Sequence, residues 1–283
     1  MRNKMYPLLI FLVFLTSTAC YEPRLGQSAP GGKKVRTRKA FSSSPGDIMK
    51  MDWETAINPY NREAEPGLAE SALLVVCIQQ FFTGPESKGM ARKIIPTINS
   101  LIRSARSAGI PVVFLQQGAR NEKEKNNEVG SWWGRSLAPD GDGFDLDPSL
   151  SRSEKDTVVV FPHYSAFKDT DLKKILLAAG VKDIIIAGVV TNVQVESTAR
   201  DAFAAGFRVF LPADATATPD HTLKLATLRN MAFGFGHITE SGSITALIKK
   251  AVRNHGGKIP RQSAEIPDQI DASIKNKKAE KTP

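Results

Sequence analysis

Apolar residues in the middle of the chain gather into short continuous runs, separated by stretches with a helical repeat. Strands are predicted at residues 72–78, 111–115, 157–161, 183–187, 208–211 and 236–239. Helices are predicted at residues 90–108, 169–179, 192–205, 221–233 and 243–253. In the first of these helices Ile98, Leu101, Ile102 and Ala105 follow the spacing of one buried face.

The alternation of strands and helices predicts the fold class. We expect an α/β, three-layer, Rossmann-like parallel sheet with helices on both faces and right-handed crossovers. The first strand, ALLVVCI, has no polar alternation, which is typical of a strand covered on both faces. Ligands of such folds bind at the carboxyl ends of the strands. Chemistry is therefore expected near Cys77, Gln116, Phe161 and Gly188.

One long segment, residues 118–153, is polar and rich in glycine. A loop of this length in a compact domain is usually functional or mobile. It contains Trp132 and Trp133, whose large apolar rings need a cleft or a partner if they are to leave water. We therefore expect a ligand or protein contact there.

The N-terminus has the pattern of an export signal. Arg2 and Lys4 precede the apolar run of residues 6–15, which is too short to span a bilayer but typical of a signal-peptide core. Small residues then lead to Cys20, as in a bacterial lipobox, although Ser17 departs from the usual branched aliphatic residue. We expect residues 1–20 to be a lipoprotein-type signal peptide. Cys20 would anchor the protein to a membrane of the cell envelope, periplasmic or on the outer surface. Secretion after cleavage near Ala19 is the alternative.

The flanks carry most of the basic charge. The formal net charge is +9 for the whole chain, with +4 in residues 1–65 and +2 in residues 254–283. Their composition predicts a flexible basic linker at 21–65 and a disordered basic tail at 254–283, around a domain at 66–253. The remaining +3 on the domain, with no binding motif, argues against nucleic-acid binding. Two cysteines exclude a disulfide scaffold.

Four stretches between residues 70 and 250 carry a family resemblance. They are ALLVVCIQQFF at 72–82, residues 94–114, HYSAF at 163–167 with its continuation to Leu172, and GVVTNVQVESTARDA at 188–202 with DATA at 214–217. In this order they resemble the isochorismatase-like cysteine hydrolase superfamily, which includes isochorismatases, nicotinamidases and N-carbamoylsarcosine amidases. The resemblance implies the isochorismatase-like hydrolase fold.

The resemblance also implies a triad, and this chain departs from it. The family has an aspartate after the first strand, a lysine after the third, and a nucleophilic cysteine in the helix after the fourth. The matching positions here are Cys77, Phe161 and Gln194. An amide is no nucleophile, a phenyl ring carries no charge, and a buried thiol is usually inert. We therefore expect no catalytic residues, and a pseudohydrolase that binds a small molecule or a protein partner at the cell envelope.

Two further expectations come from the resemblance. The turn of Val189, Val190 and Thr191 matches a family turn that often holds a non-proline cis peptide near an oxyanion hole, which favours a cis Val189–Val190 bond over an ordinary trans turn. Gln116-Gln117-Gly118 stands where the metal-binding relatives have Asp-x-His, so we expect no metal and no cofactor.

Alternatives remain open at this point. The expected pocket residues are Gln116, Trp132, Trp133, His163, Tyr164, Val189, Val190 and Thr191. Cys77 with His163 could form a rewired dyad in an active hydrolase of amide or isochorismate-like substrates. A third hypothesis is a structural or interaction module of the envelope, attracted to anionic surfaces by the basic flanks. The family resemblance further implies pairing into dimers or tetramers.

Overall fold

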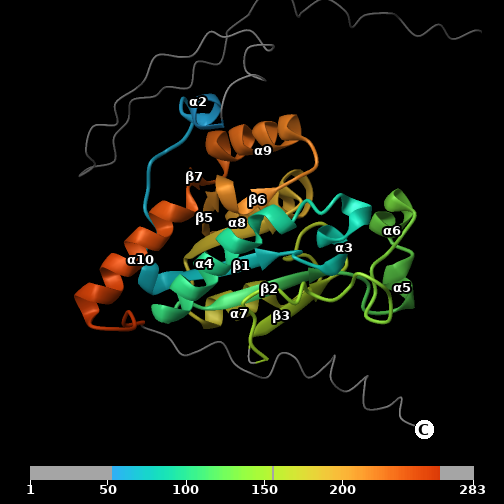
Figure 1. Cartoon of the computed structure of the whole chain (residues 1–283), viewed down its shortest axis with the longest axis horizontal. Helices are drawn as coiled ribbons and strands as arrows, with labels where there is room; N and C mark the ends of the chain where they lie inside the picture. Colours follow the sequence, from blue (N-terminus) through green and yellow to red (C-terminus); the bar gives the residue numbers. More distant parts are fainter. Residues whose placement is uncertain (1–52, 155, 262–283) are drawn as a thin grey trace, which may run out of the picture. The chain divides into compact units, whose positions relative to one another are not determined.

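The structure is a computed structural model that describes residues 53–154 and 156–261 (Figure 1). The expected signal peptide, the lipidation site Cys20, and most of the expected linker and tail lie outside the described residues. Within the described ranges, we find no helix with the length and apolar character needed to cross a membrane.

A parallel sheet of seven strands forms the centre of the domain. Its strands run in the order β3-β2-β1-β4-β5-β7, and the short β6 pairs with β4. They are β1 Ser71–Val76, β2 Val112–Gln117, β3 Thr157–Phe161, β4 Asp183–Val189, β5 Arg208–Pro212, β6 Thr216–Ala217 and β7 His237–Thr239. The predicted fold class is confirmed, and all six predicted strands are present. The two-residue β6 is too short to give a hydrophobic pattern, which is why sequence analysis missed it.

Helices connect and cover these strands. The α-helices are α2 Trp53–Ile57, α3 Gln80–Thr83, α4 Ile95–Ser107, α5 Glu122–Lys125, α6 Glu128–Trp133, α7 Leu172–Ala178, α8 Glu196–Ala204, α9 His221–Gly234 and α10 Ser241–His255. The shorter turns are η1 Leu68–Glu70, η2 Pro85–Ser87, η3 Arg92–Ile94, the π-helix η4 Thr191–Val195 and η5 Ala213–Ala215. Helix α4 begins at Ile95 and not at residue 90, since Pro96 has no N–H and fits only the first turn.

The central strands are the most deeply buried part of the molecule. Every residue of β1 and β4 is buried, as expected for strands covered on both faces. Helices α4 and α10 pack against each other, and Figure 1 shows them side by side. The buried face of α4 consists of Ile95, Ile98, Leu101, Ile102 and Ala105, so the predicted amphipathic stripe is confirmed.

A buried carboxylate fixes the start of β4. Asp183 is fully buried, and one of its oxygens accepts a hydrogen bond from Nε of Arg208 at 2.7 Å. The other oxygen accepts from the backbone N–H of Gly67 at 2.6 Å and from the same guanidinium. Because a buried charge needs partners, this cluster ties the segment before β1 to β4 and β5.

Described residues on both sides of the predicted domain, residues 66–253, contact it. Helix α2 lies inside the expected linker, and the Asn61 side chain exchanges hydrogen bonds with the backbone of Ile238. At the other end α10 continues to His255, and Ile259 is buried. Arg261 donates to the carbonyl oxygen of Ser71 at 3.0 Å. These contacts join the described residues of the expected linker and tail to the domain.

Candidate functional site

The ends of β1, β2, β3 and the segment after β4 meet around one residue, Gln117. In the sheet register Gln117 lies opposite Phe161. Its side-chain oxygen accepts a hydrogen bond from Nε2 of Gln194 at 2.8 Å, and the backbone of Gln117 influences the Cys77 thiol. The three positions expected from the sequence, Cys77, Phe161 and Gln194, are therefore brought together, with Gln117 between them.

Cys77 is a protonated, enclosed thiol. It is fully buried directly after β1 and takes a left-handed backbone conformation with φ of 54°. Burial raises the pKa of the Cys77 thiol well above its ordinary value, and this effect outweighs the lowering effect of the Gln117 backbone. The thiolate form, which is the nucleophile, is therefore scarce at neutral pH.

Phe161 supplies packing at this site and no charge. Its side chain is fully buried and is among the largest of the core. Its backbone oxygen accepts a hydrogen bond from the N–H of Gly118 at 2.9 Å, which extends the β2–β3 pairing by one residue. The site therefore has no cation at the end of β3 that could stabilise a thiolate or an oxyanion.

Gln194 lies in the π-helix η4, a rare form of helix that is frequent at functional sites. The side chain is 4% exposed. Its Oε1 accepts from the backbone N–H of Val190 at 3.2 Å, and its Nε2 donates to Gln117. The carboxamide is thus bonded at both ends within the protein.

Two more glutamines complete this buried network. The Gln79 side chain accepts from the N–H of Gln117 and donates to its carbonyl oxygen, both at 2.9 Å. Gln79 and Gln116 also each donate to the carbonyl oxygen of Phe144 at 2.7 Å. Sequence analysis named Gln116 as a pocket residue and Gln117 at the position of the relatives' metal ligands, and it missed Gln79. The signal available was the two Gln-Gln pairs at strand ends, where buried amides need amide partners.

The turn after β4 has the cis peptide bond that the family resemblance implies. The Val189–Val190 peptide bond is cis, as predicted. Gly188 has φ of +132°, and a Cβ at this position would lie 2.1 Å from the carbonyl oxygen of Val76, so only glycine fits. Val189 and Thr191 are buried, and the Thr191 hydroxyl has no hydrogen-bond partner in the described structure.

The remaining expected pocket residues point outwards. His163 bonds through Nε2 to the carboxylate of Asp169 at 2.8 Å, an interaction on the surface. The structure thus gives His163 a surface partner, and Cys77 is sealed in the core, which does not support a dyad between them. Trp132 and Trp133 are 78% and 61% exposed, so they lie in no cleft.

The two tryptophans are nevertheless held by a defined local structure. Nε1 of Trp133 donates to the hydroxyl of Tyr164 at 2.9 Å. The side chain of Asn127 caps α6 and also donates to the carbonyl oxygen of Pro162. Helix α6 ends at Gly134 in the left-handed conformation. The expected loop therefore contains two short capped helices, α5 and α6, and α6 presents its two aromatic rings to solvent.

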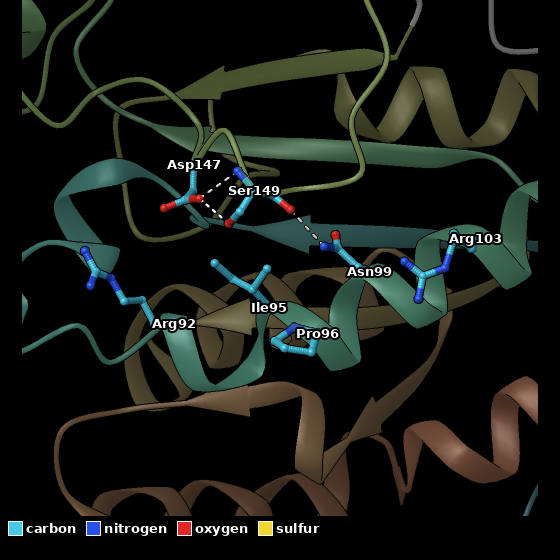
Figure 2. A pocket seen from close by; sticks show the side chains of 7 residues that line it. All are labelled: Arg92, Ile95, Pro96, Asn99, Arg103, Asp147 and Ser149. Carbon is cyan, nitrogen blue, oxygen red and sulfur yellow. Dashed lines mark hydrogen bonds between the residues drawn. The ribbon is translucent and has the colours of Figure 1, made fainter.

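A separate surface pocket of about 690 Å³ lies beside α4 (Figure 2). It is lined by Arg92, Ile95, Pro96, Asn99, Arg103, Asp147 and Ser149. Asn99 donates to the carbonyl oxygen of Ser149, and Ser149 donates to the Asp147 carboxylate, as the dashed lines in Figure 2 show. Burial would raise the pKa of Asp147, but hydrogen bonds from Ser149 and Thr83 and the charge of Arg92 hold it below its ordinary value. None of the expected site residues lines this pocket.

Metal ligands do not cluster in the part of the chain that the structure describes: it contains no group of three or more His, Cys, Asp or Glu side chains that could hold a metal ion. At the expected metal position, Gln116 and Gln117 use their side chains in the amide network.

Known proteins share this arrangement of elements. Residues 71–243 match the model of the isochorismatase domain. The chain is 35% identical over 185 residues to Nicotinamidase 3 of Arabidopsis thaliana, covering 63% of this chain and 89% of that protein. It is 30% identical over 197 residues to the ureidoacrylate amidohydrolase RutB of Azorhizobium caulinodans, covering 60% and 86%.

Solved structures of known proteins show the same fold. A cysteine hydrolase from Pseudomonas syringae pv. phaseolicola superposes with a TM-score of 0.62 at 26% identity, covering 68% of this chain and 98% of that one. An N-carbamoylsarcosine amidase from Thermoplasma acidophilum gives a TM-score of 0.53 at 25% identity, covering 61% and 96%. The domain match spans more than half of the chain and includes every strand of the sheet. This protein therefore belongs to the isochorismatase family.

Proposed function

We propose that this protein is a non-hydrolytic member of the isochorismatase family that acts by binding. The proposal takes Cys77, Phe161 and Gln194 as the positions of the family's aspartate, lysine and cysteine, as the flanking motifs imply. The observation that carries it is the hydrogen bond between Gln117 and Gln194 in a buried, neutral centre.

The chemistry of this centre supports the proposal. Covalent hydrolysis needs a nucleophile, a base within hydrogen-bond reach and a stabiliser for the developing oxyanion. Here the Cys77 thiol is protonated and enclosed, Phe161 carries no charge, and the Val190 N–H is used by Gln194. Each requirement is unmet at the position where the resemblance expects it.

Binding would then use the rim of the site. Trp133, held by Tyr164, and its neighbour Trp132 offer rigid aromatic surface outside the closed centre. A small molecule or a protein partner would contact them there, since exposed aromatic rings are common anchors of interfaces. We further propose that the protein acts in the cell envelope, through the lipid anchor at Cys20 that the sequence predicts.

The test is turnover and binding measured on the same preparation. The full-length protein is incubated with nicotinamide, ureidoacrylate, N-carbamoylsarcosine and isochorismate, and ammonia or product is followed. The same compounds, with a wider set of amides, pyridines and chorismate-like acids, are screened for a rise in melting temperature. A shift without turnover supports the proposal. Turnover by the purified protein that a Cys77→Ala variant abolishes would contradict it.

An active hydrolase is the second candidate, because several relatives at about 30% identity or more are named as amidohydrolases or nicotinamidases. In this chain the nucleophile would be Cys77, the one sulfur nucleophile at the centre of the site. A Cys77→Ser variant decides this version: it loses the activity if Cys77 attacks the substrate, and keeps it if the activity has another origin.

A further inference from the structure

We infer that the surface pocket beside α4 is a docking site for an acidic segment of this same chain, residues 262–274. The segment follows directly after Arg261, the last of the described residues, and itself lies outside them. The pocket is separate from the centre on which the proposed function rests, because none of its lining residues belongs to that centre. The docking and the proposed function can therefore be tested independently.

One side of the pocket is a single stripe of side chains on α4 and on η3 before it. Its members, Arg92, Ile95, Pro96, Asn99 and Arg103, follow the spacing of one helix face. Figure 2 shows Arg92 and Arg103 at opposite ends of this stripe, with the other three between them. At the helical rise per residue, the backbones of the two arginines are roughly 16 Å apart. A cation at each end and apolar surface between them fit an elongated ligand with several negative charges.

The polar groups of the pocket differ in whether the protein already uses them. Asn99 donates to the carbonyl oxygen of Ser149 at 2.8 Å, and the Asp147 carboxylate accepts from the Ser149 N–H at 2.9 Å. The charge of Asp147 offsets part of the charge of Arg92. Arg103 is exposed and makes no hydrogen bond or ion pair with any residue that the structure describes. The cation left for a ligand is therefore strongest at the Arg103 end.

The C-terminal segment starts at this same end of the pocket. The Ile259 N–H donates to the carbonyl oxygen of Ala108 at 3.0 Å, directly after the last residue of α4. Arg103 precedes Ala108 by roughly 8 Å along the helix. The six residues from Ile259 to Glu265 can span up to roughly 20 Å, so Glu265 can reach Arg103. Because both partners are in one chain, even weak contacts are favoured by a high effective concentration.

The charge pattern of the segment complements the pocket. Residues 262–274 contain Glu265, Asp268 and Asp271 and no lysine or arginine. Bound with an extended backbone, Glu265 and Asp271 would project from the same side, roughly 20 Å apart. This spacing matches that of the two arginines within the reach of their side chains. Pro267 would project from the same side between the two acids, against the apolar middle of the pocket.

Photo-cross-linking in the full-length protein tests the docking. Gln269, on the same side of the segment as Glu265, is replaced by the photoreactive amino acid benzoylphenylalanine, and the cross-linked residues are mapped by mass spectrometry. We expect cross-links within one chain to residues 92–103 or 147–149. Arg92→Gln/Arg103→Gln should lower their yield by roughly threefold or more, because two exposed ion pairs are lost. NaCl at about 1 M should lower it as well, since it reduces the Debye length to roughly 3 Å.

Two matched variants make the test specific. Lys168→Gln/Lys173→Gln removes two exposed positive charges outside the pocket and should leave the yield unchanged. Neutralising the segment by Glu265→Gln/Asp268→Asn/Asp271→Asn should lower the yield as the arginine variant does. Since Arg92 and Arg103 are exposed, their substitution should leave the melting temperature nearly unchanged, which checks that the variant folds.

Three results would overturn the inference. The first is a set of cross-links that falls outside the pocket. The second is a yield of pocket cross-links that stays the same in Arg92→Gln/Arg103→Gln. The third comes from a mixture of isotope-labelled and unlabelled protein: pocket cross-links that join two copies would show that the segment docks on a second molecule and not on its own chain.

Discussion

Nε2 of Gln194 lies 2.8 Å from Oε1 of Gln117, and this buried hydrogen bond joins the π-helix after β4 to the last residue of β2. The two residues are 77 positions apart in the chain. Since the bond is made between neutral groups, each amide offsets part of the cost of burying the other. The bond also contributes to the stability of the fold, because it links the π-helix after β4 to β2.

The effects of substituting Gln117 and Gln194 on the free energy of unfolding should therefore be non-additive, because the two side chains are bonded to each other. We expect Gln117→Ala to lower the free energy of unfolding by about 1–3 kcal/mol, because Nε2 of Gln194 loses its acceptor in the core. The double variant with Gln194→Ala should show a coupling of about 1 kcal/mol or more in denaturant unfolding. Gln80→Ala, at an exposed position, serves as the control and should change little. Additive effects of the two core substitutions would contradict this prediction.

Cys77 should be unreactive in the folded protein. Burial raises the pKa of its thiol, so the folded state keeps the proton at pH values where the unfolded thiol has lost it. Stability from this group is therefore complete below the ordinary thiol pKa and declines as the pH rises above it. In a Cys20→Ser background, alkylation by iodoacetamide should stay slow from pH 6 to about 9 and become fast in denaturant. Rapid alkylation of the native protein at neutral pH would show an accessible thiolate instead.

The stability of the protein should depend strongly on the ion pair between Asp183 and Arg208. The carboxylate is fully buried, whereas the arginine side chain is 54% exposed. Arg208→Met leaves a buried charge whose remaining hydrogen bond comes from the Gly67 N–H. We expect a loss of about 2–3 kcal/mol in the free energy of unfolding, at the low end for a broken buried pair because water can reach the arginine side. Arg208→Lys should retain part of the stability. If Arg208→Met proved neutral in denaturant unfolding, the pair would have no structural role.

Gly188 should tolerate no side chain. A Cβ at this position would lie 2.1 Å from the Val76 carbonyl oxygen, between two fully buried strands. Gly188→Ala should therefore abolish soluble expression or lower the melting temperature by roughly 10 °C or more. Gly242→Ala is the matched control, because no atom lies within 4 Å of its added Cβ. It should be neutral or slightly stabilising, given the helix propensity of alanine.

Much of the fold could be predicted because its strands carry local signals. Continuous apolar runs marked β1 and β4, and helical spacing marked the buried face of α4. The described parts of the flanks were harder to predict, because they are placed by distant partners. Helix α2 packs on α9, the Ile259 N–H donates to the Ala108 carbonyl oxygen, and Arg261 donates to the Ser71 carbonyl oxygen. A polar composition cannot reveal contacts of this kind.

The sequence alone determined the parallel α/β fold and the family motifs, because each lies in a contiguous stretch of chain. It also predicted Cys77, Phe161 and Gln194 as the positions of the family's triad. Only the tertiary structure decided that Gln79 and Gln117 complete the centre, that His163 turns to Asp169, and that Trp132 and Trp133 stay in solvent. The physical reason is that a side-chain amide or an imidazole bonds to whichever donor or acceptor lies within hydrogen-bond distance in the folded protein. Those positions are set when strands far apart in the chain are brought into register.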